Sequence, residues 1–449
     1  MKIAIIGSGI SGLSAAYALK NQANITLYEK RARLGGHSHT INIDYDGTPL
    51  NVDAGFIVYN AHNYPNLIEL FKNLDVETSP SDMSFAVSNP DGFEWSSNPK
   101  GLFAWKRNLF NPRFHKFWRD ILKFNDIARK ELSENRLTDR TLGDWLDRHG
   151  FNTAFRDNYI LPMGGAIWSM PEADILSYPA LSFFKFFENH RLMNRERPAW
   201  RTVTGGSQTY VKRLEALLEA DTVKDRAVTK VSRAPSTQSG NLSDNPSGGR
   251  LCVELETGER DYFDHVIMAA HSDQSQAMLS AEDFTSAHTC LGGMRYAPNR
   301  IYLHRDEAFM PARRRAWAAW NVLRQNPDHM CVTYWMNILQ GLPRDKPVFV
   351  TLNPAEPPDP AQTFVSYEFD HPQFDAPAAD SVARLKAMNG QDGLWFAGAW
   401  MGSGFHEDGL KSGLEVALAL GGKVPWEPQN LHSYAKTEKV PRRRYEVTA

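Results

Sequence analysis

The sequence has few of the residues that stabilise secreted or metal-binding proteins. It contains three cysteines among 449 residues, Cys252, Cys290 and Cys331, and they are scattered along the chain. An odd, scattered set excludes a disulfide framework and a cysteine-rich metal site. It favours a reducing compartment, and we predict no bound metal.

Long apolar runs are missing as well. The first apolar run, Ile3–Ile6, stops at Gly7, so we expect no signal peptide. No stretch approaches the roughly 18 apolar residues of a transmembrane helix. We therefore expect a cytoplasmic protein that at most lies on the inner face of a membrane.

Neither sign of charge is in excess, since 50 Lys and Arg face 52 Asp and Glu and the formal net charge is -2. Nucleic-acid binders carry a basic surplus, so we expect no nucleic-acid partner. Hydrophobic residues make up 42% and aromatic residues 11%. These aromatics suit a large apolar cavity and a bulky core equally well. The length, about three times that of one domain, predicts more than one packing unit.

The first sixty residues carry a dinucleotide-binding pattern. The segment KIAIIG (2–7) is typical of a buried parallel strand, and Gly7, Gly9 and Gly12 follow in GxGxxG spacing before an apolar helix pattern. These glycines permit a tight turn, close approach of a pyrophosphate, and close packing of helix on strand. Glu29 ends the next strand, where a carboxylate can bind the adenosine ribose. A glycine-rich turn without a ligand is the alternative.

The residues beyond Glu29 distinguish FAD from NAD. Gly35 and Gly36 follow in RARLGGHSHT (31–40), and DAGFIVYN (53–60) supplies an Asp-x-Gly. This arrangement resembles the flavin amine oxidase, protoporphyrinogen oxidase and phytoene desaturase superfamily. The resemblance implies FAD as the cofactor.

A narrower likeness covers the chain through about residue 125. The segments LGGHSHT, DAGFIVYN, YPNL (64–67) and SDMSFAVS (81–88) resemble a bacterial FAD-dependent oxidoreductase group. The N-terminal oxidase-like domain of plant cyclopropane fatty-acid synthases belongs to this group. It includes desaturases of methyl-branched fatty acyl chains in furan fatty acid synthesis. The resemblance implies a lipid acyl substrate, with a lipid methyltransferase as a functional partner.

The resemblance also implies the fold, which is α/β. It consists of a discontinuous Rossmann-like FAD-binding domain and an α+β substrate domain with a helical cap and an antiparallel sheet. We assign residues 1–85, 200–275 and 388–425 to the FAD-binding domain, 86–199 and 276–387 to the substrate-binding domain, and 426–449 to a C-terminal tail. The polar stretch 235–249 is expected to be an insertion. We also expect a homodimer.

The segment 393–422 has the pattern of a strand, a glycine-rich turn and a long helix. In the superfamily this helix directs its N-terminus at the flavin, where the helix dipole favours developing negative charge. The segment contains no cysteine, so FAD is expected to be held non-covalently. Related proteins have Glu or Asp where this chain has Ala399, which leaves the contact to the backbone, to Ser403 or to water.

One further departure lies beside the glycine pair. Many superfamily members carry Arg there, whereas this chain has His37, which donates a hydrogen bond without being a permanent cation. A surface loop histidine is the alternative. The predicted FAD-binding residues are Gly7, Gly9, Ile10, Ser11, Gly12, Glu29, Lys30, Gly35, Gly36, His37, Gly55, Phe56, Ile57, Val228, Ala269, Gly398, Ala399, Phe405, Gly409 and Leu410.

Dehydrogenation of an acyl chain requires a proton acceptor near the flavin. We predict Tyr59, His406 and Glu407 as catalytic residues, with His37 and Asp408 as further candidates. Glu407 and Asp408 are equally suited to capping the final helix. The rival functions are an amine or porphyrinogen oxidase, and a non-catalytic FAD-holding partner of a lipid-modifying enzyme.

The segment 100–124 combines positive charge with aromatic residues. It holds seven Lys or Arg against one acid, Asp120, and Phe114, Phe117 and Phe124 recur at helical spacing after an expected N-cap at Asn111. This pattern is typical of a helix that contacts an anionic membrane surface. The alternative is a helix that packs its aromatic stripe on the core. The aromatic segment 178–190 fits either an apolar tunnel or the core.

Overall fold

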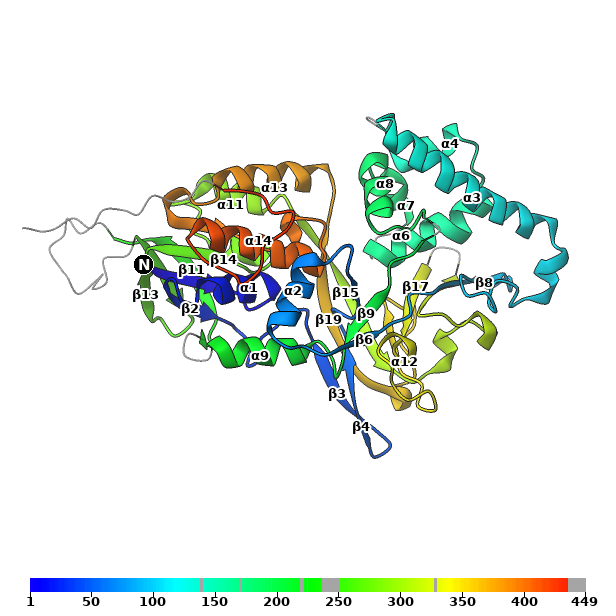
Figure 1. Cartoon of the computed structure of the whole chain (residues 1–449), viewed down its shortest axis with the longest axis horizontal. Helices are drawn as coiled ribbons and strands as arrows, with labels where there is room; N and C mark the ends of the chain where they lie inside the picture. The colour runs from blue at the N-terminus through cyan, green and yellow to red at the C-terminus, as the bar shows by residue number, and fades with distance from the viewer. Residues whose placement is uncertain are drawn as a thin grey trace, which may run out of the picture. The chain divides into compact units, whose positions relative to one another are not determined.

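The computed structural model describes residues 1–137, 140–168, 172–194, 196–218, 222–223, 225–235, 250–326 and 329–434. The fold is mixed α/β, as predicted, and the chain forms two compact units (Figure 1). Unit 1 comprises residues 1–37, 211–294 and 376–449, and unit 2 comprises 38–210 and 295–375. Most of the predicted tail and of the polar stretch 235–249 lies outside the described residues.

The compact units divide the chain at other residues than the predicted domains. Residues 38–85, predicted in the FAD-binding domain, belong to unit 2, and residues 276–294 and 376–387 belong to unit 1. Compactness is a different criterion from cofactor contact. The assignment of functional domains therefore stays a prediction.

Unit 1 is built on a parallel sheet whose central strand is the apolar N-terminal segment. Ile3, Ala4 and Ile5 are fully buried in it, as expected for a strand covered on both faces. Because all its strand pairs are parallel, the carboxyl ends meet at one edge. In the described chain the strand order is β10 (Thr222–Val223), β2 (Asn24–Tyr28), β1 (Lys2–Ile6), β14 (His265–Met268) and β20 (Leu394–Phe396).

A second sheet and several helices complete unit 1. The sheet is antiparallel and consists of β11 (Val228–Arg233), β12 (Leu251–Leu255) and β13 (Arg260–Phe263). The helices that lie wholly or mainly in this unit are α1 (Ile10–Leu19), α9 (Gln208–Leu218), α10 (Ser272–Met278), α11 (Thr285–Leu291), α13 (Ala376–Met388) and α14 (His406–Ala419).

Unit 2 contains a larger sheet that is antiparallel, as predicted, except for one parallel pair of strands. The strand order among the described residues is β19 (Thr363–Gln373), β15 (Arg295–His304), β18 (Phe349–Leu352), β17 (His329–Trp335), β16 (Trp320–Asn326), β7 (Phe85–Ser88) and β8 (Glu94–Ser96). The pair β16–β7 is parallel and the other pairs are antiparallel. The reason is connectivity, because strands from distant segments are not constrained to the antiparallel geometry of a hairpin.

The helical cap that the sequence predicts lies in unit 2 (Figure 1). Its helices are α3 (Pro112–Ser133), α4 (Leu142–Arg148), α5 (Thr153–Phe155), α6 (Leu161–Trp168), α7 (Glu172–Ser177) and α8 (Ala180–Asn189), with a π-helical turn at Arg156–Ile160. The remaining elements are α2 (Pro65–Asn73), α12 (Met336–Leu339), the hairpin β3 (Thr40–Tyr45) and β4 (Thr48–Asp53), and the small sheet of β5 (Tyr59–Asn60), β9 (Trp200–Val203) and β6 (Thr78–Pro80).

The aromatic stripe of α3 packs on the core. Phe114, Phe117 and Phe124 are at most 4% exposed, so the stripe is not available to a membrane. Phe183 and Phe187 of α8 are fully buried and stack with ring centroids 4.3 Å apart. These α8 rings are core and not a tunnel wall, because each is enclosed by its neighbours. No helix in the described part of the chain is long and apolar enough to cross a membrane.

Candidate functional site

The glycine turn after β1 combines two closely packed glycines with one open glycine. Gly7 has φ +104°, and a Cβ on it would lie 2.8 Å from the carbonyl oxygen of Ala269. A Cβ on Gly12 would lie 1.9 Å from the carbonyl oxygen of Gly7. At Gly9 a Cβ would meet nothing within 4 Å. The turn therefore holds helix against strand at Gly7 and Gly12 and leaves room for a ligand at Gly9.

Helix α1 begins directly at this open glycine. Gly9 is its N-cap with φ -64°, and no side chain caps the first turn. A helix N-terminus offers N–H donors and the positive end of its dipole to an anion. The arrangement fits a pyrophosphate at Gly9, Ile10 and Ser11, three of the predicted residues.

A second helix N-terminus lies beside the first. The Ser14 hydroxyl donates to the carbonyl oxygen of Leu410 on α14 at 3.1 Å. A Cβ on Gly409 would lie 2.7 Å from Ile10 Cγ2, and one on Gly413 would lie 2.1 Å from the Ser11 carbonyl oxygen. Small residues thus let α1 and α14 pack at close range. This contact brings together the first and last predicted motifs, since Ser14 and Leu410 are 396 positions apart in the chain.

Ser412 fixes the turn that precedes α14, and sequence reasoning missed it. Its hydroxyl accepts from the backbone N–H of Gly398 at 2.8 Å and lies 3.1 Å from the Gly398 carbonyl oxygen. This places Gly398 and Ala399, the first residue of a 3-10 turn (Ala399–Met401), next to α14. The signal was a serine in the second turn of the helix.

Replacing Ser412 with alanine tests the contribution of its hydrogen bonds to Gly398. The buried Gly398 N–H would lose its partner, so we expect the free energy of unfolding to fall by about 1–2 kcal/mol. Urea unfolding measures the change. Ser403→Ala is the matched control, because the Ser403 side chain is exposed. An equal loss in both variants would contradict the role of Ser412.

Glu29 lies at the carboxyl end of β2. Its carboxylate accepts from the backbone N–H groups of Ser8 at 3.1 Å and Arg31 at 2.9 Å. The Arg226 N–H donates to the Glu29 carbonyl oxygen at 3.1 Å, which brings the segment before Val228 alongside. Val228 is 8% exposed. The predicted ribose ligand and the predicted adenine contact thus belong to adjacent segments, while the Lys30 side chain is exposed.

The glycine pair and His37 also adjoin the turn. The Gly35 N–H donates to the Ser8 carbonyl oxygen at 3.0 Å, and a Cβ on Gly36 would lie 3.0 Å from Gly9 Cα. The ring of His37 stacks on that of His271, with centroids 5.6 Å apart. His271 follows Ala269 and Ala270 and was not predicted, although its place after a small-residue strand end is a signal. His37 is thus held against a ring at the turn and is only partly exposed.

The predicted residues after β4 belong to unit 2. The Ala54 N–H donates to the His39 carbonyl oxygen at 2.9 Å, which fixes the backbone before Gly55. Phe56 is 9% exposed, and Ile57 is partly buried against the core. Tyr59 is 2% exposed, and its ring lies edge-on to Phe71 at 5.3 Å. Tyr59 is thus held in an aromatic cluster within unit 2.

Asp53 anchors this segment from inside unit 2. Its carboxylate accepts from the Ser207 N–H at 2.9 Å and hydroxyl at 2.8 Å, from the Thr40 hydroxyl at 2.6 Å and from Gln340 Nε2 at 2.8 Å. Burial raises the pKa of Asp53 to about 6, although the hydrogen bonds from Thr40 and Ser207 oppose the shift. The Asp of the Asp-x-Gly motif therefore joins three segments of the chain.

The first turn of α14 holds three titratable residues. Burial lowers the pKa of His406 to about 3, so its imidazole is neutral at neutral pH. Glu407 is 5% exposed. Asp408 accepts from the N–H groups of Ser403 and Phe405, both at 3.1 Å, and burial raises its pKa. Asp408 thus caps the helix, which is the role that the sequence offered for it as the alternative to catalysis.

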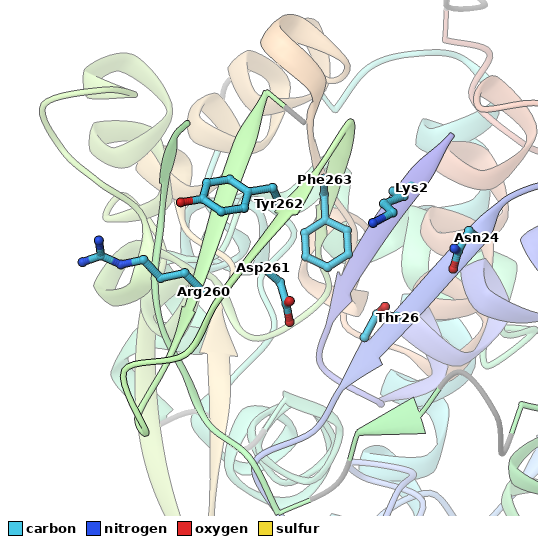
Figure 2. A pocket seen from close by; sticks show the side chains of 7 residues that line it. All are labelled: Lys2, Asn24, Thr26, Arg260, Asp261, Tyr262 and Phe263. Atoms are coloured by element: carbon cyan, nitrogen blue, oxygen red, sulfur yellow. The ribbon is translucent and has the colours of Figure 1, made fainter. Parts of the chain in front are cut away.

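A surface depression of about 260 Å³ lies elsewhere in unit 1. Figure 2 shows Lys2, Asn24 and Thr26 on one side of it and residues 260–263 of β13 on the other. Lys2 and Asn24 begin their strands, whereas the glycine turn lies at the carboxyl ends. The depression is therefore at the opposite edge of the sheet and is not the dinucleotide site.

Comparison with known proteins settles the family. Residues 10–313 match the family described as flavin containing amine oxidoreductase. The chain belongs to this family. Flavin containing amine oxidoreductases of this fold use FAD, and FAD is the cofactor. The open Gly9, the two adjacent helix N-termini and Glu29 fit it: Gly9, Ile10 and Ser11 would hold the pyrophosphate and Glu29 the ribose.

Individual relatives match at different levels. Over 72 residues the chain is 43% identical to polyamine oxidase 5 of Oryza sativa subsp. japonica, a match that spans 15% of this chain and 14% of that protein. Solved structures of putrescine oxidase bound to putrescine (TM-score 0.64) and of cyclohexylamine oxidase from Brevibacterium oxydans (TM-score 0.65) are each 16% identical. Each comparison covers 93% of this chain and 98% of the other.

A lipid-related structure has the same fold. The CLA-producing fatty acid isomerase from P. acnes has a TM-score of 0.61 and is 14% identical, over 93% of this chain and 97% of that one. At such identities these structures share the fold, and substrate does not follow from fold. The chain is therefore a flavin-dependent oxidoreductase whose substrate must be argued from its own residues.

Proposed function

We propose that this flavoprotein dehydrogenates methyl-branched or otherwise modified fatty acyl chains of phospholipids, and so acts as a desaturase. The proposal assigns the chain to the bacterial group that resembles the oxidase-like domain of plant cyclopropane fatty-acid synthases. The segments at 34–40, 53–60, 64–67 and 81–88 support that assignment. A lipid methyltransferase would supply the branched chain, because the methyl group must be added before this step.

The observation that carries the proposal is a set of partly buried apolar side chains, Ile57 among them, that packs on one core cluster of unit 2. Ile57 and Val58 are only partly buried, and they pack on the same core cluster of unit 2 as Trp320, Val332 and Tyr367, which are also partly buried. Ile57 is a predicted flavin contact. A chain of methylene groups binds through apolar contact, and partly buried apolar side chains offer it such contact.

Dehydrogenation removes a hydride from one carbon and a proton from its neighbour, and a carbon–carbon double bond forms between them. FAD, when bound, would supply the two-electron oxidising power for this reaction. The predicted proton acceptors are Tyr59, His406 and Glu407. Among them His406 is unprotonated at neutral pH but weakly basic, because burial lowers its pKa to about 3.

An amine oxidase is the second candidate function. The family description and the solved putrescine and cyclohexylamine oxidases favour it. Porphyrinogen oxidation is a further possibility within the superfamily, and a non-catalytic FAD-holding partner of a lipid-modifying enzyme is the rival from another class. All of these functions are compatible with the family and with FAD as the cofactor, so the substrate must be tested directly.

We expect the purified holoprotein to lose its visible flavin absorbance under anaerobic conditions when a methyl-branched phospholipid is added, and to retain it with putrescine. Mass spectrometry of the extracted lipid should show the loss of two hydrogens per flavin reduced. The unbranched phospholipid is the substrate control. Bleaching by putrescine alone would support the amine oxidase. Restoration of lipid desaturation in cells by a flavin-free variant would support the non-catalytic partner.

A further inference from the structure

We propose that unit 2 docks on an anionic lipid bilayer through a tip formed by residues 106–113. Leu109 and Phe110 would enter the apolar layer, and the surrounding lysines and arginines would contact the headgroups. The tip comprises the 3-10 turn η1 (Lys106–Phe110) and the start of α3 (Figure 1). This inference does not rest on the proposed substrate.

The tip exposes large apolar side chains where the rest of the surface has few. Phe110 is 84% exposed, Leu109 is 49% exposed, and Leu122 further along α3 is 56% exposed. Elsewhere in the described chain the exposed large hydrophobic residues are Met1 and Leu217. An apolar cluster rimmed by polar residues marks an interaction surface. The aromatic stripe of α3 is buried and is not part of the tip. The proposed membrane contact therefore uses the turn before α3, and not the helix face that the helical spacing indicates.

The exposure of Phe110 does not come from a frayed segment. The carbonyl oxygen of Leu109 lies 2.8 Å from His115 Nε2, one turn into α3. The Asn111 side chain caps α3 by accepting from the Arg113 N–H at 3.0 Å. Asn108 is fully buried, and its Nδ2 donates to the Glu94 carbonyl oxygen at 3.3 Å. The tip is therefore held in shape from both sides, which lowers the entropy cost of insertion.

The charge around the tip is positive and exposed. Within 100–124 the acid Asp120 is paired with Lys116 at 3.0 Å. The guanidinium groups of Arg107 and Arg313 lie over the ring of Trp105, at 5.9 and 5.4 Å from its centroid. The exposed basic side chains of the segment are Lys100, Lys106, Arg107, Arg113, Lys116, Arg119 and Lys123.

A second basic stretch adjoins this segment. A Cβ on Gly101 would lie 2.7 Å from the Arg315 carbonyl oxygen, so residues 313–315 pack against it. Arg315 is exposed, and the Arg313 side chain is 35% exposed. The chain as a whole carries a net charge of only -2, so the positive field is local. Apolar side chains within a basic field match an anionic bilayer, whereas a nucleic-acid backbone would use the charges and leave Phe110 in water.

Vesicle flotation of the full-length holoprotein tests the proposal. We expect binding to vesicles of phosphatidylglycerol and phosphatidylcholine and at least about tenfold weaker binding to phosphatidylcholine alone. The Leu109→Ala, Phe110→Ala double variant should bind the anionic vesicles at least about tenfold more weakly than the wild type does. The Lys106→Gln, Arg107→Gln double variant should lose about fivefold for each charge removed, and high salt should act in the same direction.

Matched variants separate docking from folding. Leu217→Ala removes another exposed leucine, 48% exposed on α9, and should bind as the wild type does. Phe110→Trp should retain binding, and thermal melting should be unchanged for every variant at the tip. Equal binding of Leu109→Ala, Phe110→Ala and wild type would overturn the proposal. The proposal would also fail if the protein were a dimer that Phe110→Ala converts to a monomer, because a second copy would then cover the tip. Preferential binding of the tip to duplex DNA would overturn it as well.

Discussion

The Gly9→Val variant is expected to fold normally and to purify without flavin. Gly9 has φ -64° and ψ 177°, a conformation that valine adopts readily, and a Cβ there meets nothing within 4 Å. The apoprotein should therefore melt within about 2 °C of wild-type apoprotein, because valine adds no strain. The valine side chain instead fills the space that the pyrophosphate needs, so the dissociation constant of FAD should rise by about 100-fold or more.

Titration of the apoprotein with FAD, followed by quenching of flavin fluorescence, measures this change. Gly12→Ala is the informative contrast, because its Cβ would lie 1.9 Å from the backbone carbonyl oxygen of Gly7. That variant should lose about 1–3 kcal/mol of unfolding free energy even without FAD. If Gly9→Val bound FAD as tightly as wild type, the open face of the turn would not be the cofactor site.

Removal of the Asp53 carboxylate is expected to cost the holoprotein about 3 kcal/mol or more of unfolding free energy. In Asp53→Ala the Ser207 N–H and hydroxyl, the Thr40 hydroxyl and Gln340 Nε2 would lose their shared acceptor. Buried donors without partners cost about 1–3 kcal/mol each. Urea unfolding at saturating FAD measures the loss. Asp44→Ala is the control, because Asp44 lies on the exposed side of the same hairpin.

The same residue gives a pH dependence with a defined sign. Burial raises the pKa of Asp53 from 3.8 to about 6, so between these values the folded protein holds a proton that the unfolded chain has released. The unfolding free energy therefore falls as pH rises through 6, by on the order of 3 kcal/mol relative to pH below 4. Asp53→Asn lacks this contribution. The difference between wild type and Asp53→Asn should decrease from pH 4 to 7, and an increase would contradict the raised pKa.

Local patterns in the sequence predicted the parts of the fold that depend on near neighbours. The apolar run at 3–6, the glycine spacing and the acid at Glu29 lie within thirty residues, and each acts through its own segment. The start of α3 after Asn111 follows from the same local rules, since the N-cap and the following proline are adjacent.

Contacts between distant segments could not be predicted from the sequence. Ser207 and Gln340 lie 154 and 287 positions from Asp53, and no local pattern reveals that they meet its carboxylate. The parallel pairing of β7 with β16 is equally remote. The exposure of Phe110 was not predicted for a different reason. Helical spacing identifies the face of a helix that packs inward, whereas Phe110 belongs to the turn before the helix.

The order of segments in unit 1 has a consequence for synthesis on the ribosome. Strand β1 pairs with β2 nearby, but its other neighbour β14 begins at His265, and the edge strand β20 begins at Leu394. Helix α14, whose start adjoins the glycine turn, emerges later still. During most of translation the turn is therefore present without the neighbours that shape it. Flavin insertion is accordingly expected late, after nearly the whole chain has left the exit tunnel, and prematurely terminated chains are expected to be colourless.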